Sequence, residues 1–473
     1  MSQPALISLI GLGFGDCGKG LFTDFFCRQA PLRGAAAAPT CIVVRFNGGA
    51  QAGHNVVLPD GRHHTFSQFG AGTLVPGVVT VLAQPVIVHP TALQVEELAL
   101  QAIGITNAFA RLHIDARCRI NTPFHQAAGR LRELQRASAG HGSCGVGVGE
   151  VARHALSWPD EVLRYADLLT PALALQRLQA QRQRFQLEFS GLPVPVIGAQ
   201  VWQRECALLA DEHVPMRWLA AVQPLVRQCP PAETTQLAAL LQRARQVVFE
   251  GAQGMLLDED HGFHPHTTWS RVGPNAAEEV ARGYGLTEPH HHLGIVRSYL
   301  TRHGHGPFPT HHGPDDPRHH AALHALPEPH NIPGGWQGAF RRGHPDAVLL
   351  RYSLAAAGPL QALLVSHLDA FATAKLVPLV WCDRYDAPEQ TDDSDLCVRN
   401  SARQVTALRP RKGDLAHQAR LTNLLWQARP VYAATPVESA RECVAQLEAY
   451  TGCAVWYGSF GPTFETVQRL KAP

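Results

Sequence analysis

Several features that would assign a chain to a special class of protein are missing from this sequence. No apolar run among its 473 residues reaches the roughly 20 residues needed to cross a bilayer. The formal net charge is only +2, so nothing suggests binding to nucleic acid or to an acidic membrane surface. The eleven cysteines show no CxxC spacing, which favours free thiols in a reducing compartment over a disulfide framework. We therefore expect a cytoplasmic protein that binds neither nucleic acid nor membranes.

A signal peptide and an internal repeat are also missing. The first apolar run leads straight into a glycine-rich turn, which is not the pattern of a signal peptide. The apolar fraction is 45%, enough for a sizeable core in one large domain or in two closely joined ones.

Strand-like apolar runs alternate with stretches of helical periodicity. Helical spacing is seen at residues 91–103 and 172–185, whereas residues 310–338 are rich in Pro, His and Gly and predict a long surface loop. The alternation predicts an α/β fold, with a mainly parallel central sheet, helices on both faces and ligands at the carboxyl ends of the strands. The strand-like runs are IVVRF, PVIVH, VPVIGA, QVVFEGA, ALLVSHL and LVPLVWC.

The turn from Gly13 to Gly20, GFGDCGKG, follows the apolar run ALISLIGL and precedes an apolar pattern of helical spacing. Glycines allow backbone N–H groups to converge on an anion, and the helix start adds partial positive charge, so the turn predicts a P-loop-like phosphate site with Lys19 as its point charge. The Walker pattern GxxxxGK[ST] fits up to Lys19, but Gly20 stands where a hydroxyl usually helps to hold magnesium. Asp16 is the nearest group that could replace this hydroxyl. A purely structural glycine turn is the alternative.

A second glycine-rich motif, TCIVVRFNGGAQAGHNVV, lies at residues 40–57. Together with GFGDCGKG it resembles adenylosuccinate synthetases, whose members carry a GDEGKGK loop followed by a GGxNAGHT segment. The resemblance continues in the order of the family through FEGAQGMLLDEDHGFHPHTT (249–268), RSYLTRHGHGPFPT (297–310), RRGHPDAVLLRYSL (341–354), VSHLDAF (365–371) and GSFGPTFET (458–466). It implies one large domain of the adenylosuccinate synthetase type over residues 1–473, with excursions at about residues 100–245 and 305–340.

The resemblance implies a ligase of purine biosynthesis that uses GTP to aminate a 6-oxopurine nucleotide such as IMP, through a 6-phosphoryl intermediate. Phosphorylation makes the 6-oxygen a good leaving group, and the chemistry needs a base for N1, a proton donor near the departing phosphate, and magnesium. The resemblance gives the catalytic roles to Asp16 as base, His54 as acid and Lys19 on the phosphates. It places Mg²⁺ on Asp16 and on the carbonyl of Gly53. It also implies a homodimer whose partners are a purine nucleotide and an amine.

The resemblance further assigns residues that bind the two nucleotides. Gln253 matches a position that holds the nucleotide substrate, because an amide can both donate to and accept from a 6-oxopurine. Thr268 suits a phosphate oxygen, and Asp369 corresponds to the aspartate that reads guanine. The expected nucleotide- and phosphate-binding residues are Gly15, Gly18, Lys19, Gly20, Gly53, His54, Asn55, Asp369, Gly458 and Gly461. The expected substrate-binding residues are Asn47, Gln51, Ser143, Cys144, Arg153, Gln253, Thr268, Arg341 and Arg342.

The sequence departs from the family at the loop whose arginines, TTGRRRR, clamp the carboxylates of aspartate. Here residues 334–342 read GGWQGAFRR, so that Gly338, Ala339 and Phe340 replace arginines by position and only two arginines remain. Losing bidentate recognition of a carboxylate is not a conservative change. The amine donor is therefore either aspartate or a different amine.

Other departures surround the expected substrates. Residues 142–149 read GSCGVGVG where the family has GTTGRGIG. Gln51 replaces an asparagine of the family, His367 replaces a lysine on the guanine side, and Cys17 replaces the glutamate of GDEGKG.

Two alternative functions, and alternative roles for Asp16 and His54, remain at this level. The chain could be a catalytically weak nucleotide-binding regulatory paralogue, or a generic nucleotide hydrolase, although FEGAQG and LLDEDHG do not fit the second. Asp16 could merely cap a helix, and His54 could be a buried, satisfied histidine. The 26 histidines include neighbours at 290–292, 311–312 and 319–320, which favour solvated loops over a metal site.

Overall fold

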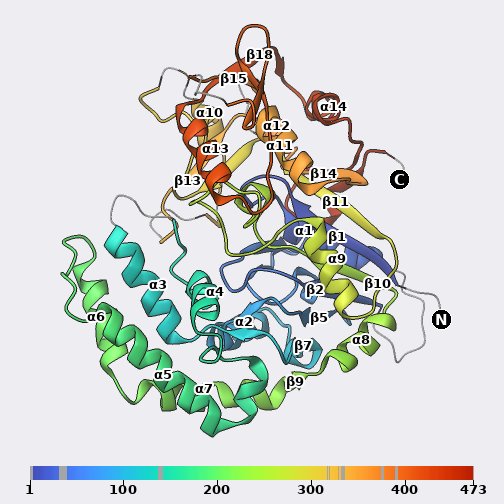
Figure 1. Cartoon of the computed structure of the whole chain (residues 1–473). Helices are drawn as coiled ribbons and strands as arrows, with labels where there is room; N and C mark the ends of the chain where they lie inside the picture. Colours follow the sequence, from blue (N-terminus) through green and yellow to red (C-terminus); the bar gives the residue numbers. More distant parts are fainter. Residues whose placement is uncertain are drawn as a thin grey trace.

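The structure is a computed structural model with a large central sheet, a helical lobe and a smaller antiparallel sheet (Figure 1). It describes residues 4–30, 40–136, 142–316, 318, 320–328, 330–331, 336–373, 378–388 and 393–471.

Within these residues a ten-stranded sheet has the order β20-β19-β14-β11-β1-β10-β2-β5-β7-β9. Every neighbouring pair is parallel except β19 and β20. The predicted mainly parallel sheet is thus confirmed. Its strands are β1 (Ala5–Gly11), β2 (Cys41–Arg45), β5 (Val79–Leu82), β7 (Leu112–Asp115), β9 (Pro231–Ala232), β10 (Gln246–Glu250), β11 (His290–Arg297), β14 (Ala362–Ser366), β19 (Val455–Ser459) and β20 (Val467–Arg469).

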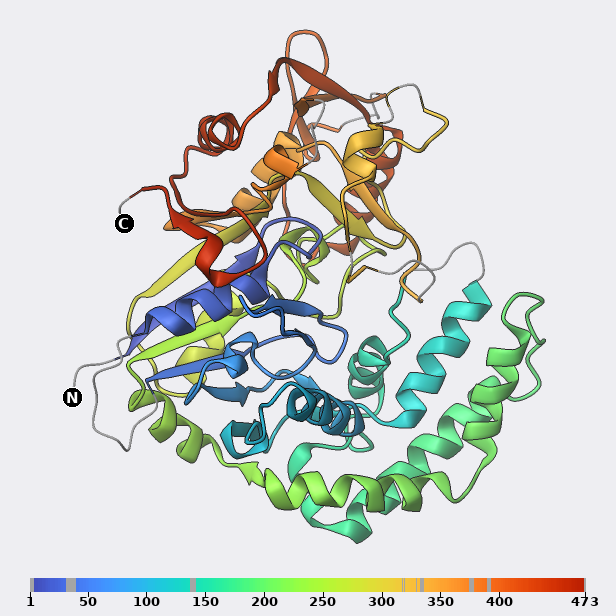
Figure 2. The same cartoon turned by 180° about the vertical axis from the view of Figure 1, so that it is seen from behind.

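Helices cover both faces of this sheet, as the alternating pattern predicts. Side chains alternate across a strand, so on β1 Leu6 and Ile10 join one apolar cluster and Leu9 joins another. The first cluster includes α8, α9, α11 and α14, and the second includes α1. Accordingly α9 lies on the near side in Figure 1 and α1, in blue, on the near side in Figure 2. These helices are α1 (Lys19–Gln29), α8 (Thr234–Gln242), α9 (Pro274–Gly283), α11 (Ala347–Ala357) and α14 (Ala440–Thr451).

A helical lobe with its own apolar cluster contains α2, which precedes β7 in the chain, and several helices that follow β7, shown in cyan and green in Figure 1. The helices predicted at 91–103 and 172–185 are confirmed as α2 (Pro90–Ala102) and α5 (Pro171–Phe189). The strand predicted from VPVIGA is wrong, because Val196 and Ile197 are 98% and 85% exposed, and neither Pro195 within the run nor Pro193 just before it can donate to a ladder. The other helices of the lobe are α3 (Pro123–Arg136), α4 (Val148–Ser157), α6 (Ala199–Ala210) and α7 (Val214–Gln228).

A four-stranded antiparallel sheet lies at the other end of the molecule, with the order β16-β17-β15-β18. The part of LVPLVWC from Leu379 onward lies in this sheet rather than in the central one, and PVIVH contributes only a short strand that pairs with β8. The strands of these smaller sheets are β6 (Ile87–Val88), β8 (Arg119–Ile120), β15 (Leu379–Asp386), β16 (Cys397–Arg399), β17 (Val405–Leu408) and β18 (Arg429–Val437). The remaining elements are β3 (His54–Val57), β4 (His63–Phe66), β12 (Leu300–His303), β13 (Phe340–Gly343), α10 (Ala321–His324), α12 (Ala370–Thr373) and α13 (Leu415–Gln427).

The segment at residues 310–338 is more than a surface loop. Its described part contains the short helix α10 and buries Leu323 and Leu326, because the apolar residues of AALHAL pack against the main core. Among the described residues, none of the helices has the length and apolar character required to cross a membrane.

Candidate active site

The phosphate loop connects β1 to α1 at the carboxyl end of the central strand. Asp16, Gly15 and Gly18 have φ values of +53°, +89° and +88°, which explains two glycines of the motif and places Asp16 in a conformation that few side chains adopt. Lys19 is buried, and its Nζ donates to the carbonyl oxygen of Gln253 at 2.6 Å. Backbone N–H groups at the start of a helix, together with a lysine, form a suitable site for phosphate.

Close packing explains why Gly20 takes the place of the usual Ser or Thr. A Cβ atom at this position would lie 2.7 Å from the carbonyl oxygen of Asn55 and 3.0 Å from the carbonyl carbon of His54. A side chain therefore does not fit. The hydroxyl is missing because the motif at residues 40–57, which carries His54 and Asn55, packs directly against the phosphate loop at Gly20.

His54 begins β3 and is paired with Glu250 at the end of β10. Its Nδ1 lies 2.6 Å from Oε1 of Glu250, and Oε2 of the same carboxylate accepts from the N–H of Ala71 at 3.0 Å. Burial lowers the pKa of His54 to about 4, although Glu250 acts in the opposite direction. Burial pushes the pKa of Glu250 up, but its contacts with His54 and Arg45 outweigh this and lower it. At neutral pH a neutral imidazole thus donates from Nδ1 to an ionised carboxylate, and Nε2 is its basic nitrogen.

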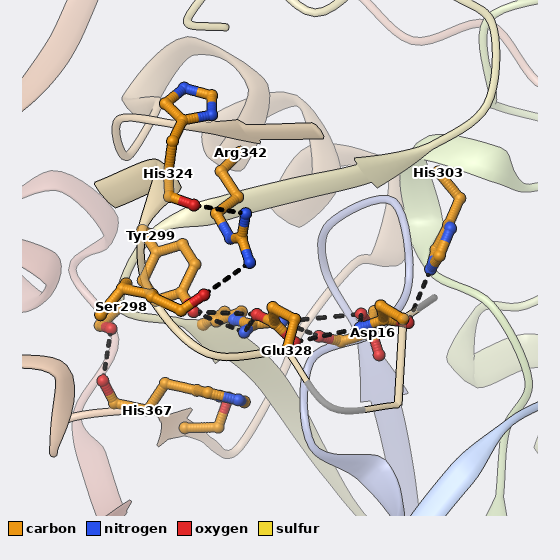
Figure 3. A network of polar contacts seen from close by, with 12 residues as sticks. Asp16, Ser298, Tyr299, His303, His324, Glu328, Arg342 and His367 are labelled. Carbon is orange, nitrogen blue, oxygen red and sulfur yellow. Dashed lines mark hydrogen bonds and ion pairs between the residues drawn. The ribbon is translucent and has the colours of Figure 1, made fainter. Parts of the chain in front are cut away.

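Asp16 lies in a network of polar side chains from distant parts of the chain (Figure 3). Its Oδ2 accepts from Nδ2 of Asn331 at 2.9 Å and lies 3.6 Å from Nη1 of Arg297. Arg297 is almost completely buried and forms an ion pair with Glu328. The Asp16 carboxylate, at 31% exposure, is therefore held at one oxygen and accessible.

Two glutamine amides lie beside the phosphate loop. Gln51 Oε1 and Gln253 Oε1 are buried and have no hydrogen-bond partner within the described residues. A Cβ atom on Gly48 would lie 3.3 Å from the Gln51 amide nitrogen and 3.4 Å from Oε1 of Gln253, so both amides border the same point. Buried amides without partners are costly, and a purine base with donors and acceptors would satisfy them.

Asn47 and Thr268 both make hydrogen bonds with the main chain. The Asn47 amide is fully engaged with main chain, because it donates to Arg271 at 3.1 Å and accepts from Ala252 at 2.7 Å. Asn47 therefore holds the backbone at Ala252, which directly precedes Gln253. Thr268 is half-buried, and its backbone N–H donates to Leu257 at 2.8 Å.

The two loops that depart most from the family pack against each other. A Cβ atom on Gly145 would lie 2.6 Å from the ring of Trp336, and the Gly145 carbonyl accepts from Arg130 at 3.0 Å. Within the same loop, Ser143 accepts from the N–H of Gly145, and burial raises the pKa of the Cys144 thiol. The changes at residues 142–149 and 336–342 therefore form one altered region; residues 332–335, including Gly334, lie outside the described residues.

Both remaining arginines of the 334–342 stretch are bonded to main chain. Arg341 donates to the carbonyls of Gly304 and Gly306 at 2.6 and 3.0 Å, and Arg342 donates to those of His324 and Leu326 at 3.0 and 2.7 Å. Burial lowers the pKa of Arg341 to about 10. Arg153 likewise donates to Glu150, at 2.9 Å. None of these three guanidinium groups is unpaired.

The ends of β14 and β19 bring the expected guanine-side residues together. The N–H of Leu368 donates to the Ser459 carbonyl at 3.0 Å, and a Cβ atom on Gly458 would lie 2.6 Å from the Leu368 side chain. Burial raises the pKa of Asp369 and holds that of His367 well below its usual value. His367, with φ of +61°, therefore presents a neutral ring where the family has a lysine.

Most histidines in the runs of adjacent histidines at 290–292, 311–312 and 319–320 make structural contacts. His292 Nε2 pairs with Glu278 at 2.9 Å, and His311 Nδ1 donates to the Arg342 carbonyl at 2.8 Å. Within the part of the chain that the structure describes, which excludes His319, no three His, Cys, Asp or Glu side chains group as metal ligands.

Four residues of the site were not assigned a role from the sequence: Glu250, Arg297, Glu328 and Asn331. The first two lie inside the motifs FEGAQG and RSYLTRHG, which could have pointed to them. No sequence signal marks the other two.

The chain is similar to known proteins over most of its length. A family model described as adenylosuccinate synthetase matches residues 8–467. The adenylosuccinate synthetase of Mycolicibacterium vanbaalenii is 31% identical over 403 residues, and that of Mycobacterium leprae is 31% identical over 409; each match covers 85% of both chains.

Two solved structures share the fold. The fully ligated adenylosuccinate synthetase from Plasmodium falciparum matches with a TM-score of 0.73 at 18% identity, over 98% of this chain and 100% of that one. The succinoaminodeoxyadenylate synthetase of cyanophage S-2L, bound to dGMP and dATP, matches with a TM-score of 0.53 at 15% identity, over 100% of this chain and 97% of that one.

Proposed function

This chain belongs to the adenylosuccinate synthetase family, whose members are ligases that form a C–N bond with GTP, and from this premise we propose how its own residues act. The reaction is amination of a 6-oxopurine nucleotide of the IMP type through a 6-phosphoryl intermediate. The observation that carries it is the placement of Asp16, Lys19 and the His54–Glu250 pair around one phosphate loop. The comparisons give no support to the regulatory alternative.

Asp16 is the base in this scheme. As the 6-oxygen attacks the γ-phosphorus of GTP, the proton on N1 moves to the Asp16 carboxylate and GDP leaves. Oδ2 is held by Asn331, whereas Oδ1 has no hydrogen-bond partner among the described residues and remains able to receive the proton.

His54 and Lys19 act on the phosphates. Lys19 exchanges the carbonyl of Gln253 for a phosphate oxygen, and the resulting negative charge beside His54 raises the pKa of its imidazole from about 4. The protonated ring can then donate from Nε2 as the amine attacks C6 and phosphate departs, while Glu250 stabilises the positive charge.

Magnesium fits this site. Mg²⁺ in such enzymes is usually bound by one or two carboxylates and by substrate phosphates, and Asp16 supplies an accessible carboxylate beside the loop. We assign the ion to Asp16 and to the carbonyl of Gly53. When bound, it would neutralise charge on the phosphates.

Asp369 is assigned to the guanine of GTP, where a carboxylate accepts from the ring N–H and the amino group. We also propose a homodimer in the cytoplasm. The dimer is carried over from the family, and the compartment is supported by eleven cysteines that are all free thiols.

Phosphate release from GTP, measured with and without IMP and an amine, tests this function. Strong dependence on both co-substrates would support the ligase, whereas equal release without an acceptor would identify a nucleotide hydrolase.

Aspartate is expected to be a poor amine donor. Gly338, Ala339 and Phe340 carry no charge, and the guanidinium groups of Arg341 and Arg342 are directed at main-chain carbonyls. A hydrogen bond to a charged group contributes about 1.5–3 kcal/mol. Losing two such contacts weakens binding by roughly two to four orders of magnitude. Steady-state kinetics with IMP, GTP and a panel of amino acids and simple amines should therefore find a better donor.

An ordinary micromolar to millimolar Michaelis constant for aspartate, with no better amine in the panel, would contradict this expectation. The chain would then be an adenylosuccinate synthetase with a rebuilt loop.

A further inference from the structure

Glu328 and Asn331 reach the phosphate loop from a segment more than 300 residues away in sequence. Asn331 Nδ2 donates to Oδ2 of Asp16 at 2.9 Å and to Oε2 of Glu328 at 3.0 Å. Both residues lie between α10 and β13, in the stretch whose composition resembles a surface loop. Figure 3 shows Glu328 beside Asp16, with His303 on the opposite side.

The partners of Asn331 fix the orientation of its amide. Its Oδ1 lies 2.9 Å from Nε2 of His303, and its nitrogen faces two carboxylates, which can only accept hydrogen bonds. The reverse orientation would set an amide oxygen against both carboxylates. Asn331 therefore aims one N–H at Asp16 and the other at Glu328.

Glu328 also holds Arg297, the cationic neighbour of Asp16. Its Oε1 accepts from Arg297 and from the hydroxyl of Tyr299, the latter at 3.1 Å. Arg297 in turn donates from Nη1 to the Asp16 carbonyl at 3.3 Å. A guanidinium that is only 4% exposed needs such a carboxylate to remain charged and in place. Glu328 thus orients two donors toward Asp16 without contacting it.

We propose that Asn331 and Glu328 are positioning residues for Asp16 and that both belong to the active site. The inference rests on the proposed role of Asp16 as base. Oδ2 of Asp16 accepts from Asn331 at 2.9 Å and lies 3.6 Å from Nη1 of Arg297, so the orientation of the carboxylate comes from this network. Proton transfer requires the Asp16 carboxylate to lie at hydrogen-bond distance from N1 of the purine. A small displacement of the carboxylate therefore lowers kcat rather than the affinity for the nucleotides.

Variants at position 331 separate this role from a merely structural one. Asn331→Ala should lower kcat by about 10–100-fold, the usual effect of losing an outer-shell partner, with little change in the KM for IMP or GTP. Asn331→Asp keeps the size of the side chain but sets an acceptor against Asp16, so we expect it to be worse than Asn331→Ala. A role in filling space predicts the opposite order.

Glu328→Gln is the second variant, because it replaces one acceptor oxygen by a donor that faces Asn331 or Arg297. It should show the same fall in kcat with nearly constant KM. Asn107→Ala is the matched control: Asn107 is an exposed asparagine that accepts from Arg111 at 3.2 Å, and neither residue has a role in the proposed mechanism. Thermal unfolding and calorimetric binding of IMP establish that each variant is folded.

Wild-type kcat in folded Asn331→Ala and Glu328→Gln would overturn the inference, as would a parallel rise of KM. An increase in kcat would also overturn it, because the segment would then hold Asp16 in a resting state. The Asp16→Asn variant distinguishes a failure of the positioning role from a failure of the proposed base. If Asp16→Asn is inactive while these variants are normal, only the positioning role fails; if Asp16→Asn is active, the proposed base fails.

Discussion

Asp16→Asn is expected to fold normally and to lose nearly all nucleotide-dependent turnover, roughly a thousandfold or more, as for the loss of a general base. An amide can neither take the N1 proton nor supply an anionic ligand to Mg²⁺. The fold should persist because the carboxylate is 31% exposed and contacts the polar side chains of Asn331 and Arg297. Steady-state phosphate release with IMP, GTP and the best amine measures the effect.

Asp60→Asn is the control for this variant. Asp60 is an exposed aspartate paired with Arg62, so its substitution should leave turnover unchanged. Ordinary turnover in purified Asp16→Asn would remove Asp16 from the mechanism.

His54→Ala should retain nucleotide binding and lose roughly two or more orders of magnitude in rate, the usual scale of general acid catalysis with charge stabilisation. The substitution also leaves the buried Glu250 carboxylate without its partner, although the N–H of Ala71 still donates to it. His54→Gln supplies an amide donor for Glu250 but no titratable nitrogen. We therefore expect it to recover stability without recovering rate.

The measurements are kcat and the dissociation constants of both nucleotides, with His213→Ala as an exposed-histidine control. If binding and rate fall in parallel in both His54 variants, His54 is structural and its role as an acid is refuted.

The features that the sequence predicts correctly are those set by neighbouring residues. An apolar run, glycines and a lysine before a helical pattern predict β1, the phosphate loop and α1, because strand, turn and helix start are local choices. Helical periodicity at 91–103 and 172–185 is equally local. The parallel sheet follows from the alternation of such elements.

The features that the sequence does not predict depend on contacts between distant residues. VPVIGA has strand-like composition, but its proline, the proline just before it and the lack of a pairing strand leave Val196 and Ile197 exposed. The direction of the Arg341 and Arg342 side chains is decided by carbonyls that other segments bring near β13. The same holds for Asn331, which is identified only by its distance to Asp16.

Transfer of the 6-oxygen is the most direct test of the central claim. IMP labelled with ¹⁸O at position 6 is incubated with the enzyme, GTP, Mg²⁺ and the best amine, and the released phosphate is examined by mass spectrometry. A 6-phosphoryl intermediate places one ¹⁸O atom in each phosphate released with aminated product. Product formed with unlabelled phosphate, or phosphate released without IMP at the same rate, would contradict the account.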